Sequence, residues 1–392
     1  MSARRRLAQF RAPDESGAEE RAWPVVRAAY AERVPAPRRA RRARLLIVPA
    51  VAALAAGVAL TPAGATVGRW IRHALAEPHA ARALFSLPAP GRVLVSGREG
   101  AWIVSANGSK RRLGSWTQAS FSPNGRFVAV AAGSTLAAVD TVGTARWTLT
   151  RPAVSDPRWW GPLGYWVAYL SGSTLRVVWG NGENDRLLAA GVDRVAPAWR
   201  PGIAGYAYQV AYVARSGSVV VRDAQTGSLS WRSPPGPKPI ELGWSSGGTR
   251  LLALYRSGAV VYDARGRLVS RVTLAAGTPA RAGALSPDGR QLALVRGGVG
   301  DAVIYPVGAR HSPPTRVFSG AGLGQLAWSP NGRWLLISWP ANDQWIFVRT
   351  TLGRVRRLLA VSRIAEQFSP GRPASGYPEL DGWCCTNTGA TG

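Results

Sequence analysis

The chain has 392 residues with 46% hydrophobic content, which is enough to bury a substantial core. Its formal net charge is +28, and its only lysines are Lys110 and Lys238. A basic chain invites a nucleic-acid partner, but an arginine bias is also what a GC-rich genome produces, so we expect no nucleic-acid binding. The three histidines, His73, His79 and His311, are too widely spread to form a zinc-binding pair on a helix.

Residues 1–44 form a basic leader that ends in five arginines between positions 38 and 44. Within it, residues 16–19 fit a helix-capping box, and four apolar residues downstream fall on one helical face although Pro24 interrupts them. These four residues are Trp23, Val26, Tyr30 and Val34. Two interpretations remain open: the stripe docks a cytosolic partner, or the leader is a disordered or membrane-lying segment.

Residues 45–68 contain no charged side chain. About 20 apolar residues suffice to cross a bilayer, so this run predicts one transmembrane helix. The arginines before it predict, by the positive-inside rule, a cytoplasmic leader and an extracytoplasmic remainder, with residues 69–90 as the linker. The alternatives are a signal peptide cleaved after about Ala65, a buried core helix and a twin-arginine export signal around Arg41 and Arg42.

Downstream of the linker, the sequence Ser-Pro-Asn/Asp-Gly-Arg occurs three times, at residues 122–126, 286–290 and 329–333. Proline presets φ near −65°, Asn or Asp bonds its own backbone, and glycine supplies positive φ. A short apolar run follows each copy. We therefore predict a tight turn that leads into a buried strand.

Weaker copies of the turn divide the rest of the chain. They occupy residues 159–162, 199–202, 244–247 and 368–372, so that successive copies are 39 to 46 residues apart. That period matches a four-stranded propeller blade. Within the repeats, Asp140, Asp223 and Asp263 follow second strands at comparable places, where we expect each to cap a turn.

The two ends of the repeat region are both incomplete. Residues 92–113 contain strand patterns without a preceding turn, whereas the copy at Phe368 has the turn but little chain after it. Joining them makes one blade from both ends, which closes a ring without open edges. We predict an all-β, seven-bladed β-propeller over residues 91–385, with six blades as the fallback.

These repeats resemble those of the TolB-like and WD40-like β-propellers, whose Ser-Pro-Asp-Gly turn precedes an apolar strand. No Gly-His dipeptide opens a repeat here and no Trp-Asp dipeptide closes one, so TolB-like is the better description. The resemblance implies a propeller fold. It leaves function open, because such propellers include binding scaffolds and domains attached to enzymes.

Chemical motifs are sparse, and we predict no catalytic, cofactor-binding or metal-binding residue and no cofactor. The polar loop at residues 181–185 is interpreted as a hairpin tip rather than a cation site. Residues 320–324 are glycine-rich but occupy a linker between blades and lack the helix of a nucleotide-binding loop. Asn107 and Gly108 form a favoured hairpin turn, which we prefer to a glycosylation site.

Cys384 and Cys385 are the only cysteines, and they are adjacent. In an oxidising exterior they form a vicinal disulfide or link to another molecule, and both alternatives stay open. We expect Trp383 and the cysteines to lie in the closing blade, and residues 386–392 to form a flexible tail.

Together these features predict a non-enzymatic, single-pass protein of the cell membrane whose extracytoplasmic propeller binds an unknown protein or envelope ligand on its loop-lined face or central channel. Its basic exterior suits anionic envelope polymers or lipid head groups. The layout also resembles transmembrane anti-sigma regulators, in which the leader would grip a cytosolic transcription factor. A third alternative is an enzyme with a site at the channel mouth.

Overall fold

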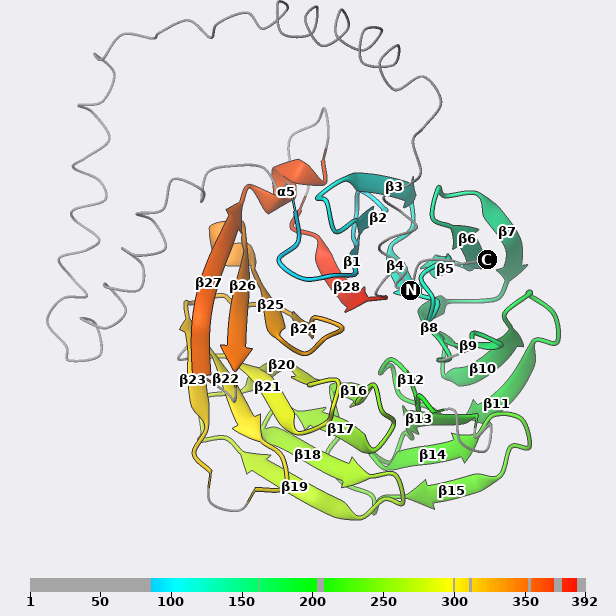
Figure 1. Cartoon of the computed structure of the whole chain (residues 1–392). Helices are drawn as coiled ribbons and strands as arrows, with labels where there is room; N and C mark the ends of the chain where they lie inside the picture. The colour runs from blue at the N-terminus through cyan, green and yellow to red at the C-terminus, as the bar shows by residue number, and fades with distance from the viewer. Residues whose placement is uncertain are drawn as a thin grey trace, which may run out of the picture. The chain divides into compact units, whose positions relative to one another are not determined.

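The computed structural model describes residues 86–385 apart from 162, 203–207, 299, 310–311, 352–353 and 370–375. Within this part of the chain, strands β1 to β28 form seven four-stranded antiparallel sheets. The sheets surround a common axis as the blades of one ring (Figure 1). The predicted all-β, seven-bladed propeller is therefore confirmed, and the six-bladed fallback is excluded.

Each blade runs from an innermost strand at the axis to an outermost strand at the rim. Blade 1 consists of β28 (Glu379–Cys384), β1 (Arg92–Ser96), β2 (Ala101–Val104) and β3 (Lys110–Gly114). Blades 2 and 3 consist of β4 (Gln118–Phe121), β5 (Phe127–Ala132), β6 (Thr135–Asp140), β7 (Ala145–Thr150), β8 (Val154–Trp159), β9 (Trp166–Ser171), β10 (Thr174–Trp179) and β11 (Arg186–Ala190).

The remaining four blades repeat this order. Blades 4 and 5 consist of β12 (Ala198–Trp199), β13 (Gln209–Val213), β14 (Val219–Asp223), β15 (Leu229–Arg232), β16 (Glu241–Trp244), β17 (Arg250–Tyr255), β18 (Gly258–Asp263) and β19 (Leu268–Thr273). Blades 6 and 7 consist of β20 (Ala280–Leu285), β21 (Gln291–Arg296), β22 (Asp301–Pro306), β23 (Thr315–Ser319), β24 (Leu326–Trp328), β25 (Trp334–Trp339), β26 (Gln344–Thr351) and β27 (Arg354–Ser362). Two short helices, η2 (Pro340–Asn342) and α5 (Ile364–Gln367), complete the described elements.

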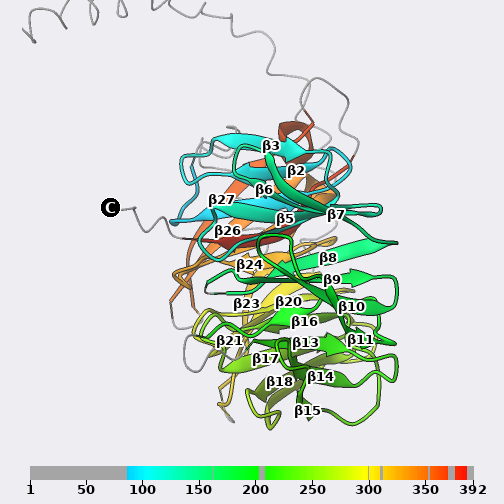
Figure 2. The same ribbon diagram turned by 90° about the vertical axis from the view of Figure 1, so that its right-hand side faces the viewer.

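The middle strands are apolar on both faces because each blade is covered by two neighbours. In β5, Val128 and Val130 pack towards blade 1, whereas Ala129 and Ala131 pack towards blade 3. The side view shows the sheets stacked against one another in this way (Figure 2). Since both faces are buried, the sequence of such a strand is a continuous apolar run instead of an alternating one.

The repeated turn joins the innermost strand of a blade to the second strand. Ser122 Oγ donates a hydrogen bond to Asn124 Oδ1 at 3.0 Å and accepts one from the Phe127 N–H, also at 3.0 Å. Gly125 has φ +66°, which glycine adopts without strain. The strict copies at residues 286–290 and 329–333 repeat these hydrogen bonds. The sequence interpretation of a tight turn leading into a buried strand is confirmed.

The ring closes where the two ends of the described chain meet. Strand β28 pairs with β1 in antiparallel register, with Val93 opposite Trp383 and Leu94 opposite Gly382. Closure by strands from both ends is thus confirmed. The prediction that Phe368 belongs to a copy of the repeated turn is wrong. In the other blades this turn follows the innermost strand, whereas Phe368 follows α5 and comes before the innermost strand β28. Its ring instead lies 5.9 Å from that of Trp102.

No helix among the described residues is long and apolar enough to cross a membrane. The predicted leader (1–44), transmembrane helix (45–68) and tail (386–392) lie outside the described residues. The same holds for Trp23, Val26, Tyr30, Val34 and the three histidines.

Candidate functional site

The innermost strand of each blade lies beside the ring axis (Figure 1), and several of these strands carry polar residues. Gln118, Arg158, Glu241 and Asp381 lie on β4, β8, β16 and β28, and all four are half-buried. Gln325 directly precedes β24. The sequence did not single out any of these residues.

Three of these side chains form the same link between neighbouring blades. Gln118 Oε1 accepts a hydrogen bond from the Asp156 N–H of blade 3 at 2.7 Å. Gln325 Oε1 likewise accepts the Leu380 N–H of blade 1 at 2.7 Å, and Glu241 Oε2 accepts the Gly283 N–H of blade 6 at 3.1 Å. We call these side chains, Gln118, Glu241 and Gln325, the axial latches. They satisfy backbone donors at blade junctions, which gives them a structural role.

The latches had a sequence signal that could have revealed them. Gln118, Glu241 and Gln325 each stand four positions before the serine of their blade's turn, which is Ser122, Ser245 or Ser329. The three positions share this spacing, but the role of the side chain depends on the neighbouring blade. Since the hydrogen-bond donor lies in another repeat, a single repeat could not explain the polar residue.

Two carboxyl groups near the axis titrate close to neutrality. Burial raises the pKa of Glu241 to about 7, although the Gly283 N–H and the charge of Arg158 favour its ionised form. Burial also raises the pKa of Asp381 to about 7, against the opposing influence of Ser96 and Arg158. Asp381 Oδ2 is buried without a hydrogen-bond partner among the described residues. A protonated Glu241 still has a carbonyl oxygen for Gly283, so the latch survives neutralisation of the acid.

A second set of contacts joins the turns of successive blades around the axis. A Cβ added to Gly332 would lie 3.4 Å from Pro287 of the preceding blade, and one added to Gly91 would lie 3.1 Å from Pro330. The proline of one turn therefore packs against a glycine of the next blade. Blade 1 has no such turn, because its innermost strand ends at Cys384 and its second strand begins at Arg92.

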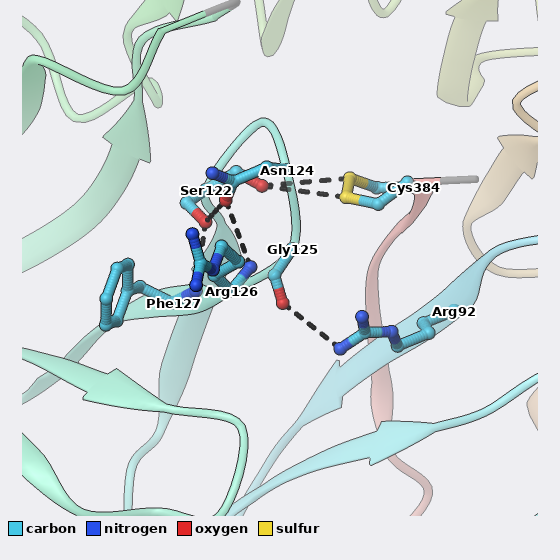
Figure 3. Close-up of a disulfide and its surroundings, with 8 residues drawn as sticks. Arg92, Ser122, Asn124, Gly125, Arg126, Phe127 and Cys384 are labelled. Carbon is cyan, nitrogen blue, oxygen red and sulfur yellow. Dashed lines mark hydrogen bonds between the residues drawn. A yellow bond between two sulfur atoms is a disulfide. The ribbon is translucent and has the colours of Figure 1, made fainter. Parts of the chain in front are cut away.

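At this seam the two cysteines replace the missing turn (Figure 3). Cys384 and Cys385 are joined by a vicinal disulfide in this structure, and the redox state of the pair stays a prediction. A Cβ added to Gly125 of blade 2 would lie 3.1 Å from Cys385 Sγ, so this residue takes the place that proline has elsewhere. The sulfur atoms lie 4.0 and 3.6 Å from the carbonyl oxygen of Ser122. Arg92 adds a 3.1 Å hydrogen bond to the Gly125 oxygen.

The polar loop at residues 181–185 is a hairpin tip closed by its own contacts, as expected. Asn181 Nδ2 donates to Glu183 Oε2 at 2.9 Å. Asp185 points inward and forms ion pairs with Arg151 and Arg176, both at 2.7 Å. Burial opposes ionisation of Asp185, but the hydrogen bonds from Arg176 and Tyr169 outweigh it and lower the pKa.

The predicted turn caps are confirmed. Asp140 Oδ1 accepts the N–H groups of Val142 and Thr144 at 3.0 and 2.9 Å, which closes the turn after β6. Asp223 and Asp263 do the same after β14 and β18. Asn107 also makes the expected hairpin turn, since its Oδ1 accepts the Ser109 N–H at 3.1 Å.

Comparison with known proteins supports the fold and leaves the activity open. No family model matches the sequence, and no curated protein matches it. Among solved structures, the chain is similar to Kluyveromyces lactis Hsv2, with 13% identity, a TM-score of 0.53, and coverage of 69% of this chain and 95% of that one. It is also similar to a chain of the mitotic checkpoint complex, with 15% identity, a TM-score of 0.51, and coverage of 72% and 84%. At these identities the likeness shows a shared seven-bladed, WD40-like propeller fold and nothing finer.

Proposed function

We propose that this protein is a single-pass membrane protein whose extracytoplasmic propeller is a non-enzymatic scaffold for an unknown protein or envelope ligand. The observation that carries the proposal is the Cys384–Cys385 disulfide at the ring closure. Disulfides persist in oxidising compartments and are rare in the cytosol. The uncharged run at residues 45–68, preceded by an arginine cluster, supports the same topology.

The geometry of the ring favours binding over chemistry. Gln118, Glu241 and Gln325, the polar side chains that reach the axis as latches, are engaged in holding neighbouring blades together. The turns and hairpin loops are held by their own hydrogen bonds. Such a scaffold presents loops from seven blades in fixed positions, which suits recognition of a partner on one face.

The topology is tested with the full chain in a bacterial host. Thiols are blocked with a membrane-permeant alkylating reagent before lysis, and peptides that contain Cys384 and Cys385 are analysed by mass spectrometry without reductant. We expect the oxidised pair, together with protease access to the propeller in spheroplasts. Reduced cysteines in a protease-protected propeller would contradict the proposal. The matched control, a Cys384→Ser/Cys385→Ser chain, should show the same protease access.

A regulatory role is the second candidate, and the apolar stripe of the leader favours it. In this proposal Trp23, Val26, Tyr30 and Val34 grip a cytosolic transcription factor, in the manner of an anti-sigma protein, while the propeller senses the envelope. Affinity purification of the full chain is compared with that of a Trp23→Ser/Tyr30→Ser chain. Recovery of the same cytosolic proteins by both chains would argue against this role.

A further inference from the structure

The end of the outer hairpin of blade 7 concentrates positive charge. In the pairing of β26 with β27, Arg349 lies directly opposite Arg357, and a register shift next to this pair adds Arg356. Arg354 begins β27, opposite Thr351. All four arginines are exposed. Like charges directly opposite each other destabilise a sheet, so this arrangement is unfavourable in the absence of an anion.

Nothing in the described structure neutralises these arginines. Arg349, Arg354, Arg356 and Arg357 form no ion pair or side-chain hydrogen bond with described residues. The only acidic residue between positions 326 and 362 is Asp343, which lies at the opposite end of β26. We call these four residues the hairpin arginines.

A fifth arginine comes from the turn of the same blade. The backbone oxygen of Arg333 accepts the Thr350 N–H at 3.0 Å, which places it beside the end of β26. The side chain of Arg333 is exposed. The hairpin arginines therefore lie at the end of the blades that carries the Ser-Pro-Asn/Asp-Gly-Arg turns, which we call the turn end.

We propose that the hairpin arginines bind the anionic head groups of a phospholipid membrane. Guanidinium groups make bidentate hydrogen bonds to phosphate, and juxtamembrane basic clusters bind acidic lipids. This proposal rests on the proposed membrane anchor at residues 45–68. The site is a docking surface for the lipid leaflet, which neutralises the charges that the sheet leaves unpaired.

The chain enters the propeller at the same end as the hairpin arginines, which favours a lipid surface over other polyanions. The Leu87 N–H donates to Ala106 O at 2.8 Å, in the turn that follows β2. Since Val104 of β2 pairs with Val93, near Cys384, this turn belongs to the turn end of blade 1, next to blade 7. Residues 69–86 span at most about 65 Å when extended. With the proposed anchor at residues 45–68, a linker of this length would let the turn end reach the bilayer.

The test uses the full chain with a Thr351→Cys label in lipid nanodiscs. The disulfide stays oxidised, so only the new cysteine is labelled, and energy transfer to an acceptor lipid measures the distance of the hairpin from the head groups. Transfer should be higher in discs that contain phosphatidylglycerol than in pure phosphatidylcholine, and about 0.5 M salt should abolish the difference. An added arm with inorganic phosphate distinguishes a lipid surface from a free anion, since phosphate at low millimolar concentration should not compete.

Variants make the test specific. Replacement of all four hairpin arginines by serine should lower transfer to the phosphatidylcholine level. The control replaces an equal number of exposed arginines at the other end of blades 4 and 5, namely Arg215, Arg232, Arg256 and Arg271. It should behave like the parent chain. Equal transfer in both lipids, or equal loss in both variants, would overturn the lipid site while the anchor stands.

A chain that fails to enter the discs would instead contradict the proposed function. The hairpin arginines are then tested on preformed vesicles by co-sedimentation of the full chain. Loss of roughly fivefold in affinity per arginine for phosphatidylglycerol vesicles, absent in the control variant, would support lipid binding. Equal binding of both variants would overturn it.

Discussion

Blade 2 and blade 1 solve the same problem in different ways. In blade 2, residues 122–126 connect the innermost strand to the second strand by a continuous turn. In blade 1 the corresponding strands, β28 and β1, come from opposite ends of the described chain and share only hydrogen bonds and packing. The cysteine pair occupies the place of Ser-Pro. The comparison teaches that the contacts around the axis can be preserved at the seam although the covalent connection is lost.

The largest expected effect comes from removing the tryptophan that holds the closing strand. Trp383 is 6% exposed and packs against Phe347, and Trp328 occupies the equivalent place in blade 7 with the same exposure. Trp383→Ala and Trp328→Ala should each lower the free energy of unfolding by about 3–5 kcal/mol. Only Trp383→Ala should also speed amide exchange in β1, measured by mass spectrometry. Equal exchange in both variants would show that the seam is no weaker than an internal blade.

The next effect tests whether the cysteine pair packs as tightly as a turn. Gly125 and Gly133 have similar φ values, +66° and +60°, but only Gly125 faces a neighbour, Cys385. Gly133→Ala should cost about 1 kcal/mol for its left-handed backbone, whereas Gly125→Ala should cost about 2–3 kcal/mol because the disulfide must also move. Denaturant unfolding checks the difference. Equal losses of stability in the two variants would mean that Cys385 can move away from the added methyl group without an energetic penalty.

The third effect compares a buried acid at the seam, Asp381, with one at an internal blade junction, Glu241. Asp381 and Glu241 both have a folded pKa of about 7, above the values of about 4 in an unfolded chain. The folded state thus binds more protons between these pH values, so stability falls as pH rises from about 4 to 7. At about pH 8, ionisation of each group should lower the free energy of unfolding by about 1–3 kcal/mol. Asp381→Asn or Glu241→Gln should remove the loss that its own carboxyl group causes.

Thermal unfolding between about pH 5 and pH 8 measures this loss. Glu241→Gln keeps an oxygen for the Gly283 N–H, so we expect a gain in stability at the higher pH without a loss at the lower one. A parent chain with a flat profile would contradict the argument. A larger gain for Asp381→Asn would show that the buried, unpartnered oxygen at the seam is the more costly of the two.

The smallest effect concerns the disulfide itself. Its closed loop is minimal, so the unfolded chain loses little entropy, and Cys384→Ser/Cys385→Ser should cost under about 1 kcal/mol. Pro123→Ala in blade 2 should cost a similar amount, about 0.4–1 kcal/mol, because proline also acts through the unfolded state. Parallel denaturation curves compare them. A cysteine variant several times more costly than Pro123→Ala would mean that the disulfide does more than replace a turn.

Local turn chemistry made much of the architecture predictable from the sequence. Pro, Gly and Asn or Asp at fixed spacing define the turns at residues 122–126, 286–290 and 329–333, and their period of about forty defines the blades. The error at Phe368 has the same origin, since residues 368–372 match the motif in sequence, whereas Phe368 precedes the innermost strand instead of following it. The sequence placed Trp383 and the cysteines in the closing blade but did not delimit the closing strand, Glu379–Cys384, because it lacks a continuous apolar run.

The contacts between blades were harder to predict from the sequence than the blades themselves. Gln118, Glu241 and Gln325 bond backbone groups 38 to 55 residues away, and no local pattern specifies those partners. Arg349 lies opposite Arg357 only because of the register between β26 and β27, which includes a shift next to this pair. The sequence pattern did not specify that register. The transmembrane helix at residues 45–68 and the leader remain predictions from the sequence.

The pairing of β28 with β1 has a consequence for biosynthesis. The inner edge of β1, the first described strand, stays unpaired until residues 379–384 have been synthesised. At a translation rate of about 5–20 residues per second, this delay is roughly 15–60 s. Nascent chains therefore carry an open β-edge until residues 379–384 are synthesised, and products that stop before them keep it. Ring closure thereby reports that synthesis has passed this strand, and an edge-binding chaperone or protease can distinguish closed rings from shorter fragments.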